Sequence, residues 1–417
     1  MIIMVITVEE LKGLEQDEVE RLFNRGVEYL GFMDDAMKIV ETVRSDGDDA
    51  LFKFTKEFDR VDLDQIEVGE DEIESAMRDV DENLLRNLKL AHSNILEFHR
   101  RQRGRDLWMD EITEGITLGQ KCVPIESVGV YVPSSYPSSA LMTVTPAKVA
   151  GVDKILLTTP PRRDGSIDPS VIAAAKIAGA DRIFKVGGAH AIGALATGTE
   201  TIPRVSKIVG PGNVYVTAAK IYVRSMGYCE IDFPAGPSEI VIIADSSADA
   251  RWVAADMKAQ EEHDSMAISI LLTTSRELAE EVSRMMNGSQ SRIFLIDTLE
   301  EGIWFINRFA PEHLEIITEN PFSVLEGVRN AGSIFLGGYS PVAAGDYATG
   351  TNHVLPTAGY SRIFSGLSLE SFMKTMSVQM LTERGLERIK DAAVALARQE
   401  NFDRHAESII IRFEGDK

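Results

Sequence analysis

The sequence contains only seven histidines, whose side chains can bind a metal or move protons near neutral pH. Gln260 and His263 stand three residues apart near the end of a predicted helix over 249–262, so both side chains project from one face and can converge on one ion or ligand. Imidazole is a common ligand of Zn²⁺, whereas an amide oxygen is an infrequent one. Spacing alone leaves a metal site and an ordinary helix surface both open.

A glutamate and a histidine follow a proline in Ala310-Pro-Glu-His-Leu314. Neighbouring residues on a helix point about 100° apart, so Glu312 and His313 would not form a simple hydrogen-bonded pair there. Pro311 can instead start a turn in which both side chains reach one cleft and exchange protons with a substrate. A surface glutamate beside a half-buried histidine is the alternative.

The segment from Ala344 to His353 has neither a helical nor a strand period, and it contains Asp346 as well as His353. Long irregular segments inside compact domains often carry function. The composition leaves a functional loop and a plain connection equally open.

Three glycine-rich turns, at 186–192, 209–213 and 234–239, follow predicted strands or open helices. Turns at the carboxyl ends of parallel strands bring backbone N–H groups and helix N-termini to a phosphate or carboxylate. None of the three has the G-x-G-x-x-G pattern of the standard dinucleotide fingerprint. They suggest a nucleotide site without specifying one.

The elements that must position these residues begin with a helical region, because apolar residues recur every three or four positions from Thr7 to about Arg103. From Val128 short apolar runs such as 154–159 and 182–186 alternate with helical segments. That alternation is typical of βαβ units and a parallel sheet.

A second series of βαβ units is predicted between 292 and 336, beyond strand-like runs at 239–245 and 267–272. Helices are predicted over 369–399 and a last strand over 408–413. The sequence therefore favours an α/β protein with helical segments at both ends.

Composition excludes several classes of function. The formal charge of −22 disfavours nucleic acid and membrane partners, because the surrounding field repels phosphate backbones and anionic lipids. The sequence contains no run of ~20 apolar residues, the length needed to span a membrane. The short apolar stretch at its start lacks the basic residues that precede the apolar core of a signal peptide. Two cysteines without a CxxC pair provide neither a disulfide framework nor a thiolate zinc knuckle. These features favour a cytoplasmic setting.

Taken together, the segments resemble the histidinol dehydrogenase family. The motifs that carry the resemblance keep their order and approximate spacing: Val128-Gly-Val-Tyr-Val-Pro133, Pro146-Ala-Lys-Val-Ala-Gly-Val152, Val186-Gly-Gly-Ala189, Gly198-Thr-Glu-Thr201, Lys207-Ile-Val-Gly-Pro-Gly-Asn213, Ala235-Gly-Pro-Ser-Glu239, Gln260 to His263, Ala310-Pro-Glu-His-Leu314 and Gly345-Asp-Tyr-Ala-Thr-Gly-Thr-Asn-His-Val-Leu-Pro-Thr357.

The resemblance implies a zinc-containing, NAD-dependent homodimer with shared active sites that oxidises L-histidinol through L-histidinal to L-histidine, using two NAD⁺. By resemblance, the zinc ligands are Gln260, His263 and Asp346, with His405 supplied by the tail of the other subunit. The same resemblance assigns substrate contacts to these four ligands and to a further set: Ser238, His313, His353 and Glu400.

For the cofactor, the resemblance implies contacts from Tyr131, His190 and Asn213. Many relatives have a glutamine at the position of His190. The stretch after Tyr131 is also shortened, because Pro133-Ser-Ser-Tyr-Pro-Ser138 lacks glycines that relatives commonly have there. Both departures lie on the predicted cofactor side.

The chemistry agrees with these roles for Glu312 and His313. Hydride leaves a carbinol carbon only as the hydroxyl proton is removed, which needs a neutral imidazole, and His313 is the predicted general base. An aldehyde must become a hydrated diol before it can lose another hydride, and Glu312 is predicted to activate that water. Zinc would mainly orient the substrate, since the d¹⁰ cation takes no part in redox chemistry.

The predicted architecture has two incomplete, Rossmann-like three-layer halves. An inserted cofactor-side domain spans 131–238, and a main domain with the metal and catalytic residues combines 23–130 with 239–368. An N-terminal helical segment covers 1–22, and a helical tail over 369–417 reaches the partner subunit.

Three alternatives stay open: a zinc-dependent dehydrogenase of another small polar alcohol, a metal-dependent hydrolase in which Glu312 activates water, and a non-catalytic nucleotide-binding protein with structural histidines.

Overall fold

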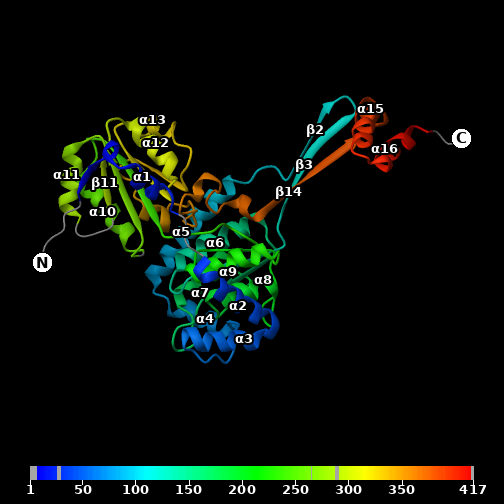
Figure 1. Ribbon diagram of the computed structural model, residues 1–417. Helices are drawn as coiled ribbons and strands as arrows, with labels where there is room; N and C mark the ends of the chain where they lie inside the picture. The colour runs from blue at the N-terminus through cyan, green and yellow to red at the C-terminus, as the bar shows by residue number, and fades with distance from the viewer. Residues whose placement is uncertain (1–6, 26–29, 264, 287–290, 415–417) are drawn as a thin grey trace. The chain divides into compact units, whose positions relative to one another are not determined.

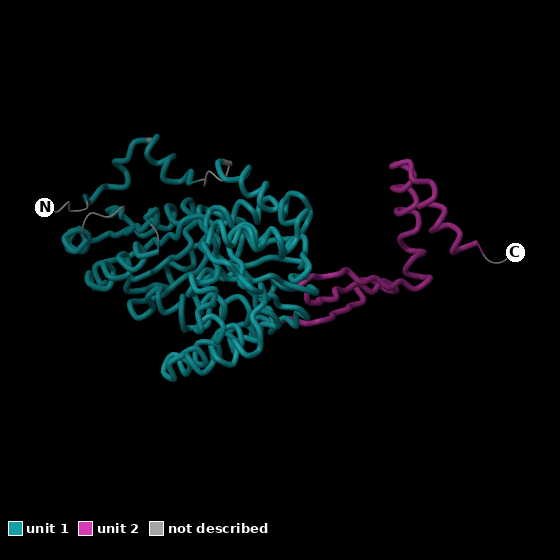
Figure 2. The backbone as a smooth tube through the Cα atoms, turned by 90° about the horizontal axis from the view of Figure 1, so that it is seen from below, with its two compact units in different colours: residues 1–102, 125–372 teal, residues 103–124, 373–417 magenta. Residues whose placement is uncertain are grey.

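The computed structural model describes residues 7–25, 30–263, 265–286 and 291–414. The chain forms two compact units, one from residues 1–102 with 125–372 and one from residues 103–124 with 373–417 (Figure 2). None of the described helices has the length and apolar character needed to cross a membrane. The predicted α/β class with parallel sheets is confirmed.

The larger unit contains a six-stranded parallel sheet in the order β1-β11-β10-β9-β12-β13 (Figure 1). Its strands are β1 (Val8–Glu10), β9 (Glu239–Ala244), β10 (Ile268–Thr273), β11 (Arg292–Leu295), β12 (His313–Ile317) and β13 (Ser333–Leu336). Ile240 and Ile242 of β9 face one core, while Val241 and Ile243 face the other. This central strand is buried on both faces, as its continuous apolar run requires.

Helices cover both faces of this sheet. One core takes in α10 (Ala250–Glu261) and α11 (Arg276–Met285). The other takes in α1 (Gln16–Phe23), α12 (Leu299–Phe309) and α13 (Pro321–Leu325).

A second parallel sheet of the same unit has five strands in the order β6-β5-β4-β7-β8. Its strands are β4 (Ser127–Tyr131), β5 (Lys154–Thr158), β6 (Arg182–Phe184), β7 (Lys207–Val209) and β8 (Glu230–Ile231). The connecting helices are α6 (Pro137–Ala150), α7 (Pro169–Ala178), α8 (Gly188–Thr197) and α9 (Val214–Ser225).

The N-terminal helices pack on this five-stranded half. They are α2 (Leu30–Asp46), α3 (Asp48–Phe54), the π-helical turn η2 (Thr55–Asp59), α4 (Glu70–Asp79) and α5 (Glu82–Arg101). Helix α2 packs on α8 and α9, α4 on α7, and α5 on α6.

The sequence groups 23–130 with 239–368 in one predicted domain, and in the structure α2 packs on the five-stranded half. Ala36, Val40 and Val43 of α2 share one core with α8 and α9. The approach is close, since a Cβ on Gly193 would lie 3.2 Å from the Cα of Val40. An apolar stripe identifies a helix but does not reveal which surface the helix covers.

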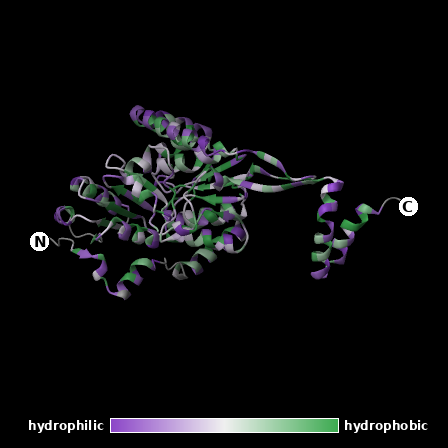
Figure 3. Ribbon diagram, turned by 90° about the horizontal axis from the view of Figure 1, so that it is seen from above, coloured by the Kyte–Doolittle hydropathy of each residue, from purple (hydrophilic) through white to green (hydrophobic). Residues whose placement is uncertain are grey.

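The smaller unit is an antiparallel sheet in the order β14-β3-β2 with two helices. Its elements are β2 (Leu107–Thr113), β3 (Ile116–Pro124), β14 (Met373–Leu381), α15 (Glu383–Gln399), α16 (Asp403–Ile410) and the short η5 (Ile411–Phe413). Gly385 and Ala406 are the only buried residues of α15 and α16, and apolar residues run along both helices in Figure 3.

Two predictions for this unit are wrong. A helix was predicted to begin at Leu369, but only the 3₁₀ turn η4 (Leu369–Phe372) precedes β14, which pairs with β3 along its whole length. A strand was predicted over 408–413, where α16 and η5 lie. Short apolar runs do not distinguish strand from helix, and here pairing with distant segments decides the outcome.

Candidate active site

The candidate catalytic residues lie at the amino end of the six-stranded sheet. Glu239 begins β9, His313 begins the adjacent strand β12, and Glu312 immediately precedes it. A cavity of about 500 Å³ opens there, and its lining includes both members of the pair together with Ser238, His263, Asp346 and His353. Because His313 starts a strand, the helical geometry that would separate the two side chains does not apply.

The backbone of Glu239 holds both side chains. Its N–H donates to Oε2 of Glu312 at 2.8 Å, and its carbonyl oxygen lies 3.1 Å from Nδ1 of His313. Since a carbonyl can only accept, Nδ1 carries a hydrogen. Nε2 of His313 has no hydrogen-bond partner and lies 3.5 Å from Oδ1 of Asp346. In the neutral imidazole, Nε2 is thus the atom free to take a proton.

The protonation of the pair is shifted by its surroundings. Burial raises the pKa of Glu312 to about 7, against the opposing effect of His313. Burial lowers the pKa of His313, but the carboxylates of Glu312 and Asp346 outweigh it and raise the value to about 9. Burial would raise the pKa of Asp346, but its interactions with His313, His353 and His263 lower it. Perturbed groups gathered in a cavity are typical of a functional site.

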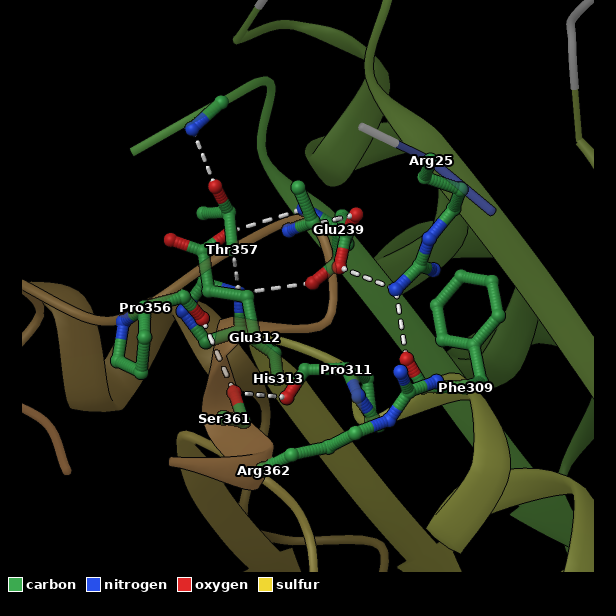
Figure 4. A network of polar contacts seen from close by, with 12 residues as sticks. Arg25, Glu239, Phe309, Pro311, Glu312, His313, Pro356, Thr357, Ser361 and Arg362 are labelled. Atoms are coloured by element: carbon green, nitrogen blue, oxygen red, sulfur yellow. Dashed lines mark hydrogen bonds and ion pairs between the residues drawn. The ribbon is translucent and has the colours of Figure 1, made fainter. Parts of the chain in front are cut away.

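A network of polar contacts anchors Glu239 from behind (Figure 4). Its side chain is 2% exposed, with one oxygen 3.4 Å from Arg25 and the other accepting from the N–H of Ala358 at 3.1 Å. Arg25 donates to the carbonyl of Phe309 at 2.6 Å, and its guanidinium carbon lies 3.2 Å from the centre of the Phe309 ring. The buried arginine thus ties an N-terminal residue to the strand that holds the pair.

Residues 356–361 tie two loops of the site together in the same view (Figure 4). The hydroxyl of Ser361 donates to the carbonyls of Pro311 and Pro356, at 3.1 and 3.0 Å. Thr357 accepts a hydrogen bond from the N–H of Gly236. The turn before Glu312 and the turn before Glu239 are therefore held by one segment.

The predicted metal ligands of the larger unit gather beside this pair. Gln260 is the buried penultimate residue of α10, His263 is exposed just beyond that helix, and Asp346 is buried in α14 (Val342–Tyr347). All three line a cavity of about 260 Å³. Nε2 of Gln260 has no hydrogen-bond partner. Among the described residues, no three or more His, Cys, Asp and Glu side chains are grouped as in a metal site. Gln260 would contribute a ligand of another type, its amide oxygen.

His353 is held in a fixed orientation. Its Nδ1 donates to the carbonyl of Asp346 at 2.8 Å, and its Nε2 lies 3.1 Å from the hydroxyl of Ser139. Burial lowers the pKa of this imidazole. Spacing missed Ser139, because its partner is 214 residues away.

Glu400 and His405 belong to the smaller unit. Glu400 is the C-cap of α15 and His405 lies in α16, and both are exposed. Their side chains are therefore on the surface of that unit.

The predicted cofactor residues lie at the carboxyl end of the five-stranded sheet. Tyr131 ends β4, His190 lies in the first turn of α8, and Asn213 caps α9. All three line a cleft of about 770 Å³ whose other wall comes from α2, α3 and η2. His190 is 1% exposed, and its Nε2 lies 3.3 Å from Oγ1 of Thr55. Tyr131 and Asn213 also line the cavity that holds Glu312 and His313.

Sequence reasoning missed the wall formed by the N-terminal helices, which supplies Lys38, Lys53, Phe58 and Asp59 to the cleft. These residues stand far from the glycine-rich turns in the chain. No local spacing connects them with those turns.

Known proteins resemble the chain over almost its full length. A family model described as histidinol dehydrogenase matches residues 27–413. The histidinol dehydrogenase of Methanosarcina mazei is 49% identical, covering 99% of both chains, and that of Archaeoglobus fulgidus is 47% identical, covering 95% of this chain and 99% of the relative.

A solved structure agrees with this result. The crystal structure of histidinol dehydrogenase from Elizabethkingia anophelis has a TM-score of 0.93 and 37% sequence identity, covering 98% of each chain. Identity at this level over nearly whole chains reflects common descent rather than a shared fold alone. The chain belongs to the histidinol dehydrogenase family and is an oxidoreductase.

Proposed function

We propose that the protein oxidises L-histidinol through L-histidinal to L-histidine, with NAD⁺ as the acceptor and zinc as a resident ion. The observation that carries the proposal is a single cavity lined both by the Glu312 and His313 pair and by the candidate cofactor residues Tyr131 and Asn213. A substrate in this cavity can contact a base and lie near a nicotinamide at the same time.

Gln260, His263 and Asp346 fit a zinc ion. They offer an amide oxygen, an imidazole nitrogen and a carboxylate around one cavity, and such nitrogen and oxygen donors suit Zn²⁺. Nε2 of Gln260 has no hydrogen-bond partner, so no hydrogen bond through this nitrogen fixes the orientation of the amide. Zinc would hold and orient the amino and imidazole nitrogens of the substrate.

His313 serves as the general base of the first oxidation. His313 lines the cavity, its Nε2 has no hydrogen-bond partner, and its Nδ1 is held by the carbonyl of Glu239. The carboxylates of Glu312 and Asp346 raise the pKa of His313 to about 9, and a cation held by Asp346 would oppose their effect and so favour the neutral imidazole. His313 then takes the hydroxyl proton of histidinol, and a bound nicotinamide would accept the hydride that leaves the carbinol carbon.

Glu312 serves the second oxidation. It accepts a hydrogen bond from the backbone of Glu239 and has a pKa of about 7, so its carboxylate can take a proton from a water molecule near neutral pH. The hydroxide adds to the carbonyl carbon of histidinal, and the resulting alkoxide oxygen takes up the proton that His313 removed in the first oxidation, which gives the hydrated diol and restores the neutral imidazole. This diol then loses its second hydride, and His313 again removes a hydroxyl proton.

The cofactor is proposed to lie in the cleft of the five-stranded half, where Tyr131, His190 and Asn213 contact it. The N-terminus of α8, with its two leading glycines, faces the same cleft and provides backbone donors for phosphate oxygens. NAD⁺ would supply the hydride acceptor in both steps.

The active form is proposed to be a homodimer in which Glu400 and His405 complete the site of the partner chain. Exposed apolar side chains on the helices of the smaller unit support this proposal, namely Ile389, Leu396, Phe402 and Ile411, which are 38 to 64% exposed. Amphipathic helices with almost no buried residue need a further surface to cover them.

Mixing two inactive variants tests the shared site. If His405 serves the partner, His405→Ala and His263→Ala subunits form heterodimers with one intact site, and activity absent from either homodimer returns. If His405 serves its own chain, each site carries one lesion and no activity returns. Subunit exchange is first verified by pull-down of a tagged subunit.

Metal analysis separates the proposal from its alternatives. Wild-type protein should contain zinc, lose histidinol-dependent NADH formation with a chelator and regain it with Zn²⁺, whereas Asp346→Asn should lose both zinc and activity. Zinc retained by Asp346→Asn would mean that the metal site is elsewhere. Turnover of another polar alcohol in preference to histidinol would favour the related dehydrogenase, and hydrolysis without NAD⁺ would favour the hydrolase.

A further inference from the structure

A buried ion pair lies behind the cleft of the five-stranded half. Lys220, on α9, is paired with Asp232, which directly follows β8. Their side chains are 4% and 1% exposed. No step proposed above uses either charge, although burying a charge costs free energy that its environment must offset.

Both charges act on the same glycine. Lys220 Nζ donates to the carbonyl of Gly210 at 3.0 Å, and the N–H of Gly210 donates to Oδ2 of Asp232 at 2.8 Å. Gly210 has φ +115°, and a Cβ at this position would lie 2.1 Å from the carbonyl oxygen of Tyr131. The ion pair thus fixes the N–H and the carbonyl of Gly210, at a position where only glycine fits.

This glycine begins the turn that reaches the ligand cavities. Pro211, Gly212 and Asn213 follow it and line the cavity of Glu312 and His313, and Asn213 also lines the cofactor cleft. Asn213 accepts hydrogen bonds from the N–H groups of Tyr215 and Val216, each at 3.1 Å, and so starts α9. The same helix carries Lys220 back to Gly210. The turn is therefore closed at its base by the ion pair.

Charge explains this arrangement better than packing does. An apolar pair of similar volume often stabilises a core as well as a buried ion pair does. An ionised donor and acceptor, however, form stronger and more directional hydrogen bonds to a backbone than neutral groups do. The retained charges therefore point to control of the turn's conformation.

We infer that Lys220 and Asp232 are positioning residues that hold the Gly210 to Asn213 turn in the conformation that binds the cofactor. The inference rests on the proposed function, because it takes the dinucleotide to bind along this turn. Loss of the pair should weaken dinucleotide binding and leave the metal and the substrate contacts of the six-stranded half intact.

The test measures NADH binding by equilibrium titration, together with KM for NAD⁺, KM for histidinol and zinc content. Asp232→Asn keeps an oxygen that can accept from Gly210 but removes the charge. We expect at least a tenfold weaker NADH affinity and a matching rise in KM for NAD⁺, with zinc content and KM for histidinol within about twofold of wild type. The double variant Lys220→Met/Asp232→Asn, which leaves no unpaired charge, should show the same pattern.

Arg224→Met is the matched control. Arg224 pairs with Glu230 at 2.9 Å and joins the same two elements, α9 and β8, without contacting Gly210. It should leave NADH affinity within about twofold of wild type. Folded variants that bind NADH as tightly as wild type would overturn the inference, and so would failure of both the single and the double variant to fold, since the pair would then be purely structural. Absence of NADH binding by the wild type would instead contradict the proposed function.

Discussion

The two halves of the larger unit use opposite ends of their parallel sheets. The proposed cofactor cleft lies at the carboxyl end of the five-stranded sheet, beyond β4, β6 and β7, where glycine-rich turns are expected to bind ligands. The catalytic pair lies at the amino end of the six-stranded sheet, where Glu239 and His313 begin their strands. The usual rule for open α/β sheets therefore locates one half of the site and not the other.

The two ends also differ in how buried charge is used. At the cofactor end, Lys220 and Asp232 bind the backbone of a turn and stay outside both cavities. At the catalytic end, Glu312, His313 and Asp346 are close enough to shift one another's pKa values. We propose that charge fixes a conformation at the first end and transfers protons at the second.

Replacing the base should give the largest difference between the two ends. His313→Asn should lower turnover by ~10²-fold or more, the usual scale for general acid–base catalysis, because His313 is the proposed general base. NADH affinity and zinc content should be unchanged. His92→Asn, on α5 and outside the site, is the control. Full turnover by His313→Asn would show that the base is elsewhere.

Replacing Glu312 should separate the two oxidations. Glu312→Gln keeps an oxygen for the N–H of Glu239 but cannot take a proton from water, so oxidation of histidinal should fall ~10²-fold or more. Oxidation of histidinol should fall less. Glu319→Gln, beyond the other end of β12, should affect neither step. Equal losses in both steps for Glu312→Gln would contradict the assignment of water activation.

The smallest predicted effect concerns stability at the cofactor end. Burial lowers the pKa of His190 from 6.5 to about 3, so between these values the unfolded chain binds a proton that the folded chain does not. Stability is therefore lost as pH falls below about 6.5, by roughly 2 kcal/mol at pH 5 relative to pH 7. Denaturant unfolding of wild type and His190→Gln at both pH values measures the difference. An identical loss in the variant would contradict this role.

Sequence patterns predicted most strands of the two parallel sheets, because buried strands of this type are continuous apolar runs. They did not predict β1, which lies in a stretch interpreted as helical, or β8 and β12. They did not assign α2 to the five-stranded half, because the apolar stripe of Ala36, Val40 and Val43 does not indicate which helices it packs against. They also missed β14, whose residues are mostly exposed and which depends on pairing with β3, more than 200 residues earlier.

Some residues of the site could likewise be predicted from the sequence, and others could not. Gln260, His263, Glu312 and His313 stand out because reactive residue types are close in sequence. Arg25 does not, because its role depends on contacts with Glu239 and Phe309, 214 and 284 residues away. Its importance follows from burial, which a local pattern cannot show.

The yield of NADH per histidinol consumed most directly tests the proposal that one end binds the cofactor and the other transfers protons in both oxidations. Purified protein is given limiting L-histidinol and excess NAD⁺ with Zn²⁺ present, and the increase in nicotinamide absorbance is compared with the L-histidine formed. Two NADH and one L-histidine per histidinol are expected, because both oxidations occur in one site with a base and a water-activating carboxylate. One NADH with accumulation of histidinal, or none, would contradict the proposed function.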